Sequence, residues 1–117
     1  MHEITYESVV QRLLETIPEF HADQEDVRDH LAHLVFEDLR RFVKSALETS
    51  NNGELLKRVF GFIEESVSGH DIRVLDVMRD SFLEGLADSP DHLSRAEKYM
   101  GASTLKLLQE ARDYLNP

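Results

Sequence analysis

Apolar residues recur every three or four positions along most of the chain, which is the spacing that places them on one face of an α-helix. The first pattern runs from Thr5 to Ile17 and stops before Pro18, because the residue that precedes proline is pushed away from helical geometry. A longer pattern covers Asp23 to Glu48, as one helix or as two helices joined near Phe36 to Asp38. The pattern leaves both versions open. Its apolar stripe consists of Val27, Leu31, Leu34, Val35, Leu39, Phe42, Val43, Ala46 and Leu47.

Four more helical patterns follow, and each has a recognisable boundary. The third helix runs from about Glu54 to Ser68, with Gly69 as the residue just beyond its end. Asp71 is suited to cap the fourth helix, the run Ser89-Pro90-Asp91 begins a short fifth helix, and Ser103 is suited to cap the last one. The apolar stripe of the fourth helix consists of Ile72, Leu75, Met78, Phe82, Leu83 and Leu86.

No segment alternates apolar and polar residues as a half-buried strand does. Short loops between helices favour antiparallel neighbours. The chain has 117 residues, which suits one domain with a hydrophobic core of its own. We therefore predict an all-α fold: residues 1–117 form a single domain, a compact bundle of five to seven antiparallel helices joined by short loops.

The charge of the chain narrows the classes of partner. The formal net charge is −10, which disfavours nucleic acid and anionic membranes and favours a basic protein partner. There is no cysteine, so disulfides and Cys-based metal sites are excluded. The residues from Met1 to Thr5 lack the regions of a secretory signal, and no apolar run approaches the ~20 residues that span a bilayer. We expect a cytoplasmic protein.

The acidic residues are densest between Glu19 and Asp29, where Arg28 is the one base among five acids. This segment is the first candidate for contact with a basic partner. Exposed acids on other predicted helix faces extend the candidate set. The predicted partner-binding residues are Asp23, Glu25, Asp26, Asp29, Glu37, Asp76 and Asp80.

One group of side chains has the composition of a metal site. On a continuous helix Asp26, His30, His33 and Glu37 would project within about 60° of one another, and His with carboxylate suits zinc or nickel. That face lies opposite the apolar stripe, so an exposed polar face is the simpler interpretation, and we expect neither metal nor cofactor. No phosphate-binding loop, Gly-x-Ser-x-Gly or His-Glu-x-x-His is present, which disfavours an enzyme. Glu64 and Glu84 are expected at the core edge, accepting hydrogen bonds.

Five short motifs, taken together, resemble a family of small bacterial all-helical proteins, and the resemblance covers about residues 36–115. Met100 and Ala102 stand where that family has leucine and proline, and His70 separates its Gly-Asp pair. Some members resemble immunity proteins of polymorphic toxin systems, so the resemblance implies a small acidic protein that binds and blocks a cognate toxin. The motifs are Asp38-Leu39-Arg40-Arg41-Phe42, Leu56-Lys57-Arg58-Val59-Phe60-Gly61-Phe62-Ile63-Glu64, Ser68-Gly69-His70-Asp71, Phe82-Leu83-Glu84-Gly85-Leu86 and Met100-Gly101-Ala102-Ser103-Thr104.

Three hypotheses follow from these observations. The first is a non-enzymatic immunity-type protein that neutralises a basic toxin domain through its acidic surface. The second is a helical interaction or regulatory module that forms a homodimer through Val10, Phe36 and Phe62, apolar residues off the predicted stripes. The third is a metal-binding protein built on the His and carboxylate group.

Overall fold

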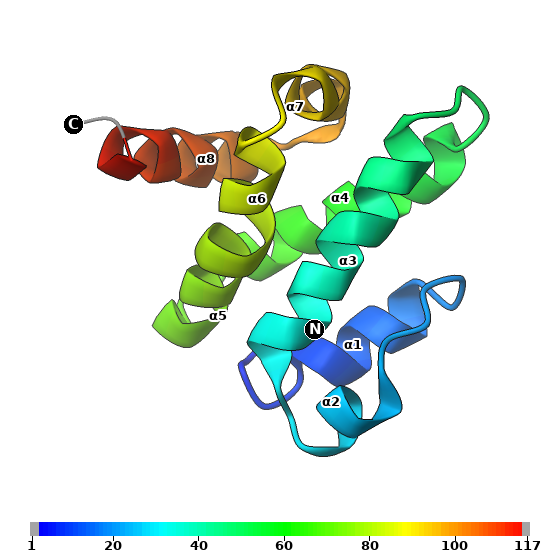
Figure 1. Ribbon diagram of the computed structural model, residues 1–117. Coiled ribbons are helices and arrows are strands. Elements are labelled where there is room, and N and C mark those ends of the chain that lie inside the picture. The colour runs from blue at the N-terminus through cyan, green and yellow to red at the C-terminus, as the bar shows by residue number, and fades with distance from the viewer. Residues whose placement is uncertain (1–2, 116–117) are drawn as a thin grey trace.

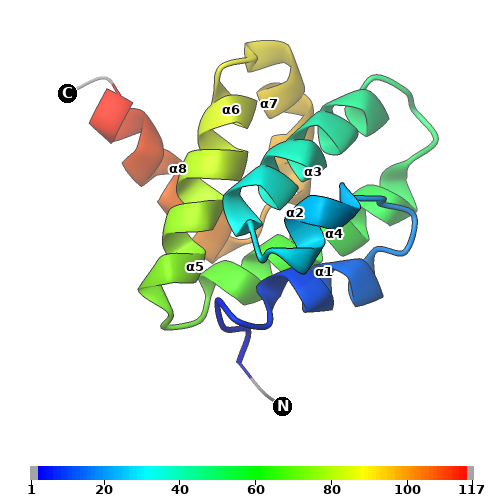
Figure 2. The same ribbon diagram turned by 60° about the horizontal axis from the view of Figure 1, so that its bottom comes forward.

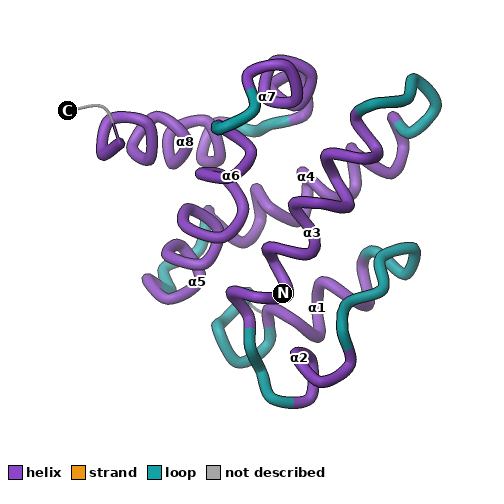
Figure 3. Tube along the Cα trace, in the orientation of Figure 1, coloured by secondary structure: helices purple, strands orange, loops and turns teal. Residues whose placement is uncertain are grey.

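The computed structural model describes residues 3–115, and every regular element in that part is helical (Figure 1, Figure 3). The segments Ile72–Val77, Met78–Leu83 and Glu84–Ala87 follow one another without a break, as do Pro90–Ala96 and Glu97–Tyr99. The described part thus holds seven separate helices joined by loops of two to seven residues, and the predicted all-α bundle is confirmed. The bounds are α1 Val9–Thr16, α2 Gln24–Arg28, α3 Ala32–Leu47, α4 Gly53–Val67, α5 Ile72–Val77, η1 Met78–Leu83, α6 Glu84–Ala87, α7 Pro90–Ala96, η2 Glu97–Tyr99 and α8 Ala102–Leu115.

The stretch from Asp23 to Glu48 is two helices, and the break is not near Phe36 but at residues 29–31. His30 has φ 55°, the left-handed region that glycine usually occupies. The backbone N–H of His30 donates to the Val27 carbonyl at 3.2 Å, and that of Leu31 donates to the Asp26 carbonyl at 2.8 Å. These two bonds are the Schellman pattern that ends a helix, with histidine in the glycine position. No glycine signals this ending, so the hydrophobic pattern placed the break wrongly.

Gly69 is the residue just beyond the capped end of α4, as predicted, but it does not adopt the left-handed conformation, since no glycine of the described residues has a positive φ. The glycine instead allows a close approach by the N-terminal segment. A Cβ atom at Gly69 would lie 2.6 Å from a carboxylate oxygen of Glu3. That carboxylate accepts a hydrogen bond from the backbone N–H of His70. The loop after α4 is therefore held by residue 3 rather than by its own conformation.

One hydrophobic core fills the space between the helices, and α3 runs through its middle (Figure 1). Helices α3 and α4 each bury seven side chains. Val10, Phe36 and Phe62 belong to this core, with 6%, 0% and 4% of their surface exposed. The apolar dimer patch predicted from these three residues is therefore wrong, since all three face inward. Each helix buries a wider face than a single stripe describes.

The segment η1, between α5 and α6, is a π-helix, in which the backbone N–H of Glu84 donates to the carbonyl of Arg79. The wider turn places Ser81 in the core beside Phe82 and Leu83. Phe82 meets Phe60 of α4 edge to face, with ring centroids 5.9 Å apart. The fourth predicted stripe is confirmed over these residues, but Ile72 at its start is 69% exposed. The long helix thus packs on α3 through its second half.

A carboxylate on α4 caps the last helix. Glu64 accepts hydrogen bonds from the backbone N–H of Ser103 at 3.1 Å and from the N–H and hydroxyl of Thr104, both at 2.8 Å. Ser103 is therefore not the cap that its sequence position predicted, whereas the expectation that Glu64 accepts hydrogen bonds at the core edge is confirmed. A Cβ atom at Gly101 would lie 2.5 Å from the carboxyl carbon of Glu64. Glycine at 101 is thus what lets a distant side chain reach this helix end.

Replacing Glu64 tests the cap. Partial burial raises the pKa of Glu64, but hydrogen bonds from Thr104 and Ser103 outweigh this effect and leave the pKa below the ordinary 4.5. A lowered carboxyl pKa stabilises the fold above the ordinary pKa, and the stabilisation is lost as the pH falls through the lowered value. We expect Glu64→Ala to lower the free energy of unfolding by about 1–3 kcal/mol at pH 7.

Urea unfolding at pH 7 and at pH 2.5 measures this effect, and the deficit of Glu64→Ala should shrink at the lower pH. Glu64→Gln serves as the matched control, because its amide oxygen can still accept from Thr104 while the charge and the acceptor for Ser103 are lost, so its deficit should be smaller than that of Glu64→Ala. Equal stability of wild type and Glu64→Ala at pH 7 would show that the cap contributes nothing.

Candidate protein-binding surface

Helix α2 and the residues that cap its two ends include four of the acids predicted to bind a partner, and the start of the helix depends on one of them. The carboxylate of Asp23 accepts hydrogen bonds from the backbone N–H of Glu25 at 2.9 Å and of Asp26 at 3.3 Å. This is an N-cap, and it fixes the direction in which the following acids leave the helix. Glu25 and Asp29 are exposed, and Asp26 is half-buried. No residue of α2 is fully buried, so the whole helix lies on the outside of the molecule (Figure 2).

The carboxylates of this region are close enough to repel one another. Partial burial raises the pKa of Asp26, and the charges of Asp23, Asp38, Glu25 and Asp29 raise it further. The influence of Asp38 shows that the acids of α2 and the middle of α3 share one surface. A raised carboxyl pKa means that the ionised form is unfavourable in the folded protein. Ionisation of Asp26 is therefore less favourable in the folded protein, first because of partial burial and then because of the neighbouring carboxylates.

Few bases neutralise this surface. Arg28 lies 3.7 Å from Asp29, and Arg41 pairs with Asp38. Asp23, Glu25, Asp26 and Glu37 form no ion pair with any residue in the range 3–115. Elsewhere most arginines face a carboxylate: the pairs are Arg12–Glu65, Arg58–Glu19, Arg73–Glu7, Arg73–Asp71, Arg79–Asp76, Arg79–Asp80 and Arg95–Asp91.

Asp76 and Asp80 are the two remaining acids predicted on other helices, and both already form ion pairs within the chain. Both face Arg79, and each nearest nitrogen–oxygen distance is 2.9 Å. Glu84, one turn further along, has its pKa raised by partial burial first and by Asp80 next. Arg79 thus holds both aspartates in ion pairs, although it offsets only one of the three negative charges at this site. We therefore define the acidic surface as Asp23, Glu25, Asp26, Asp29, Glu37 and Asp38.

Two large apolar side chains are exposed beside the acidic surface. Leu31 and Leu34 were predicted in the apolar stripe of the second pattern, but they are 42% and 44% exposed. Leu34 lies one turn before Asp38 on the same face of α3. Only Ile72 and Leu105 are comparably exposed among the large apolar residues described. The break at residue 30 explains the error, because α3 begins with a new rotation and turns these leucines outward.

The same break removes the predicted metal site. The helical face that would have gathered Asp26, His30, His33 and Glu37 does not exist, because the helix ends between the first two residues. Within residues 3–115, no group of three or more His, Cys, Asp or Glu side chains is arranged to hold a metal ion. The metal candidate rested on one continuous helix, and that premise is wrong.

His33 has a different partner. Its Nδ1 atom lies 2.6 Å from the hydroxyl oxygen of Ser81, which links the start of α3 to the π-helical segment η1. Serine with histidine can act as a nucleophile with its base. A nucleophile must also be reached by its substrate, and Ser81 is only 4% exposed. The pair is better explained as a tie between two helices.

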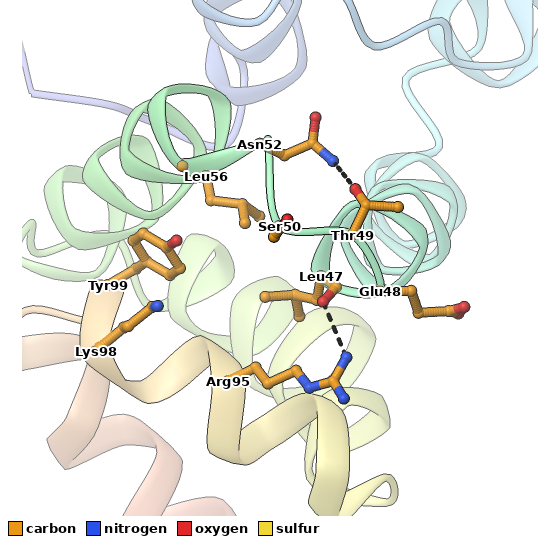
Figure 4. A pocket seen from close by; sticks show the side chains of 10 residues that line it. Leu47, Glu48, Thr49, Ser50, Asn52, Leu56, Arg95, Lys98 and Tyr99 are labelled. Carbon is orange, nitrogen blue, oxygen red and sulfur yellow. Dashed lines mark hydrogen bonds between the residues drawn. The ribbon is translucent and has the colours of Figure 1, made fainter.

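A polar hollow of about 290 Å³ lies at the opposite end of α3, where α3 and α4 meet α7 and η2 (Figure 4). Arg95 crosses it and donates to the backbone carbonyl of Leu47 at 3.2 Å, which satisfies an oxygen left free at the end of α3. The Lys98 ammonium nitrogen lies 5.2 Å from the centroid of the Tyr99 ring, within the limit of about 6 Å for a cation–π contact. These cations have roles within the chain, so the hollow is not our main candidate.

Comparison with known families covers nearly the whole chain. Residues 10–116 match a family described as Domain of unknown function (DUF7674). The chain belongs to the DUF7674 family. No curated protein and no solved structure matches it. The predicted membership of an uncharacterised family is thereby confirmed.

Several residues of the motifs that suggested a family have a clear structural role in this DUF7674 domain. Phe60, Ile63 and Phe82 are core residues, and Glu64 caps α8. The acidic surface lies on α2 and the first half of α3, mostly before these motifs. No helix among residues 3–115 is long and apolar enough to cross a membrane.

Neutralising Asp26 should stabilise the protein. The raised pKa means that the folded state holds the proton more tightly than the unfolded chain, so ionisation costs stability above the folded pKa and nothing below the ordinary 3.8. We expect Asp26→Asn to raise the melting temperature at pH 7, and the gain to disappear by about pH 3. Calorimetry across this pH range measures it.

Asp91→Asn is the matched control, because Asp91 lies 3.4 Å from Arg95 and loses an attraction rather than a repulsion. It should leave the melting temperature unchanged or lower it slightly. A lower melting temperature for Asp26→Asn at pH 7 would contradict the repulsion that we assign to the acidic surface.

Proposed function

We propose that this DUF7674 protein is a non-enzymatic, protein-binding domain that neutralises a cognate bacterial toxin through its acidic surface. The observation that carries the proposal is the set of unpaired carboxylates on α2 and α3, placed beside exposed Leu31 and Leu34. A mutual repulsion that reduces stability is typical of residues kept for function. A basic partner would remove this repulsion on binding.

The combination of charge and apolar surface suits a protein rather than a small ion. Unpaired carboxylates raise the rate of encounter with a basic surface, and this effect depends on salt. Apolar side chains at the centre of an interface supply most of the binding free energy, because their burial removes them from water. On the acidic surface the two leucines would take that central role, while Asp23, Glu25 and Glu37 would orient the partner.

The toxin as partner is the finer part of the proposal, and it comes from the resemblance to immunity proteins. Such a protein acts by occlusion: its carboxylates pair with lysines and arginines of the toxin and cover the groups that bind the toxin's anionic substrate. The producing cell would be a bacterium, and the complex would form in its cytoplasm. Occlusion needs no catalytic group, which agrees with the burial of Ser81.

The proposal predicts a toxin-like protein encoded beside this one, and co-expression of the two tests it. Wild type should restore growth, and a variant with Asp23→Asn, Glu25→Gln, Asp26→Asn and Asp29→Asn should fail. Asn at 23 keeps an acceptor for the cap of α2. We expect its affinity for the purified partner to fall by about tenfold or more at low salt, and the loss to be smaller at high salt, where charges are screened.

The matched control removes the same charge from another part of the surface, with Asp88→Asn, Glu97→Gln, Glu110→Gln and Asp113→Asn. These acids are exposed and lie on or near α6, η2 and α8. Isothermal titration calorimetry with both variants separates local from overall charge. Equal losses in the two variants would mean that net charge acts alone and that the acidic surface is not the binding site.

A further inference from the structure

The polar hollow at the end of α3 collects positive charge in a chain that is acidic overall. Two cations, Arg95 and Lys98, and one carboxylate, Glu48, line it. Figure 4 shows the Glu48 side chain directed away from Lys98. The lining of the hollow is therefore positive within a molecule of net charge −10. Charge at this place favours an anion, which is the opposite of what the acidic surface favours.

The hollow is also lined by hydrogen-bond donors that have no acceptor in the described part of the chain. The ammonium of Lys98 lies against the face of the Tyr99 ring and forms no ion pair within residues 3–115. The hydroxyls of Tyr99 and Ser50 form no hydrogen bond in the same range. Arg95 donates to one backbone carbonyl and faces Asp91 at 3.4 Å, which uses only part of the five donors of a guanidinium. A ligand rich in acceptor oxygens fits this set of donors.

The number and kind of these donors suit a phosphate group. A phosphate monoester carries three strong acceptor oxygens and nearly two negative charges, whereas a carboxylate has two oxygens and one charge. Arginine binds phosphate with a planar fork and lysine binds it as a point charge, and the hollow has one of each. Its volume of about 290 Å³ lies at the lower end of the range of about 300–1,000 Å³ that is usual for ligand pockets. The hollow therefore suits a small molecule rather than a peptide.

A wider groove along α4 adjoins the hollow and leaves room for more than the phosphate. Gly53, Lys98 and Tyr99 line both spaces. The groove has a volume of about 670 Å³ and reaches Gly61, where an added Cβ atom would meet nothing within 4 Å. Two carboxylates balance two lysines in its lining, so the excess of positive charge is confined to the hollow. An organic group attached to the phosphate would lie in this groove.

The acidic surface does not prevent an anion from binding in the hollow. Leu47 lines the hollow and follows Asp38 by nine residues, a separation of about 14 Å along α3. Salt at the physiological concentration screens exposed charges beyond about 8 Å. Under these conditions the ligand responds mainly to the charges that line the hollow.

We propose that the hollow binds the phosphate group of a small molecule, either free phosphate or a phosphate ester. Lys98 and Arg95 pair with the phosphate oxygens, and the hydroxyls of Tyr99 and Ser50 donate hydrogen bonds to them. This site goes beyond the proposed function and does not rest on it, because it lies at the other end of α3 from the acidic surface. The domain would thus carry two separate binding sites of opposite charge.

NMR titration of the labelled protein with inorganic phosphate and with glycerol 3-phosphate tests the proposal. Sodium chloride keeps the ionic strength constant, and succinate serves as an anion without phosphate. We expect saturable shifts that are largest at residues 47–56 and 95–99, with a Kd of about 1 mM or tighter and binding of succinate about tenfold weaker. A lower Kd for the ester identifies the ligand as a phosphate ester, and equal values identify it as free phosphate.

Two variants locate the site. Lys98→Gln should weaken phosphate binding by about tenfold or more, because it removes a charged donor. Tyr99→Phe keeps the ring that stacks on Phe60 and removes only the hydroxyl, so the loss should be about three- to tenfold. Lys106→Gln is the matched control, because Lys106 is an exposed lysine of α8 that forms no ion pair within residues 3–115. It should bind phosphate as wild type does.

Three results would each overturn the proposal. The first is the absence of saturable shifts around the hollow at ten times the expected Kd. The second is equal weakening by Lys98→Gln and Lys106→Gln, since the net charge would then act alone. The third is succinate binding as tightly as both phosphate compounds, since the hollow would then have no preference for phosphate.

Discussion

The burial of α3 is the constraint on which the rest of the fold depends. Seven of its side chains lie in the core, and the helices on both sides of the chain pack against it. Because α3 is covered on several sides, the neighbouring helices must pack on it from different directions. Short loops between consecutive helices make this arrangement possible. The π-helical turn of η1 and the Glu64 cap of α8 are local adjustments to this requirement. The first widens a buried face, and the second fixes α8, which packs mainly on α4, η1 and α6.

Much of the fold could be predicted because most helix boundaries have local causes. Pro18, the turn before Gly53 and the run Ser89-Pro90 act within a few residues, so the sequence shows them. The ending at His30 could not be predicted in this way, because histidine occupies a position where glycine is the usual signal. One missed boundary then misplaced Leu31 and Leu34, and it created a metal site on a helix face that does not exist. The density of acids around α2 is visible in the sequence itself, but the ion pairs of Asp76 and Asp80 with Arg79 depend on side-chain positions that the helical pattern does not give.

Charge in this DUF7674 domain has two separate roles. Over much of the described surface arginines and carboxylates form pairs, whereas the acidic surface holds six carboxylates of which only Asp29 and Asp38 face an arginine. Two leucines are exposed beside it. Composition alone gives the excess of acid but not its location, because location depends on which arginine reaches which carboxylate. The acidic surface is therefore a property of the fold as much as of the sequence.

Helix α2 is short, buries no side chain completely and ends in a left-handed histidine. An element with so few buried contacts opens locally at a small fraction of the free energy needed to unfold the whole domain. Its amide hydrogens are then the first to exchange with solvent, independently of the core formed by α3 and α4. A ligand bound against α2 would suppress this local opening. The region with the least intrinsic order is thus the one where association converts most directly into rigidity.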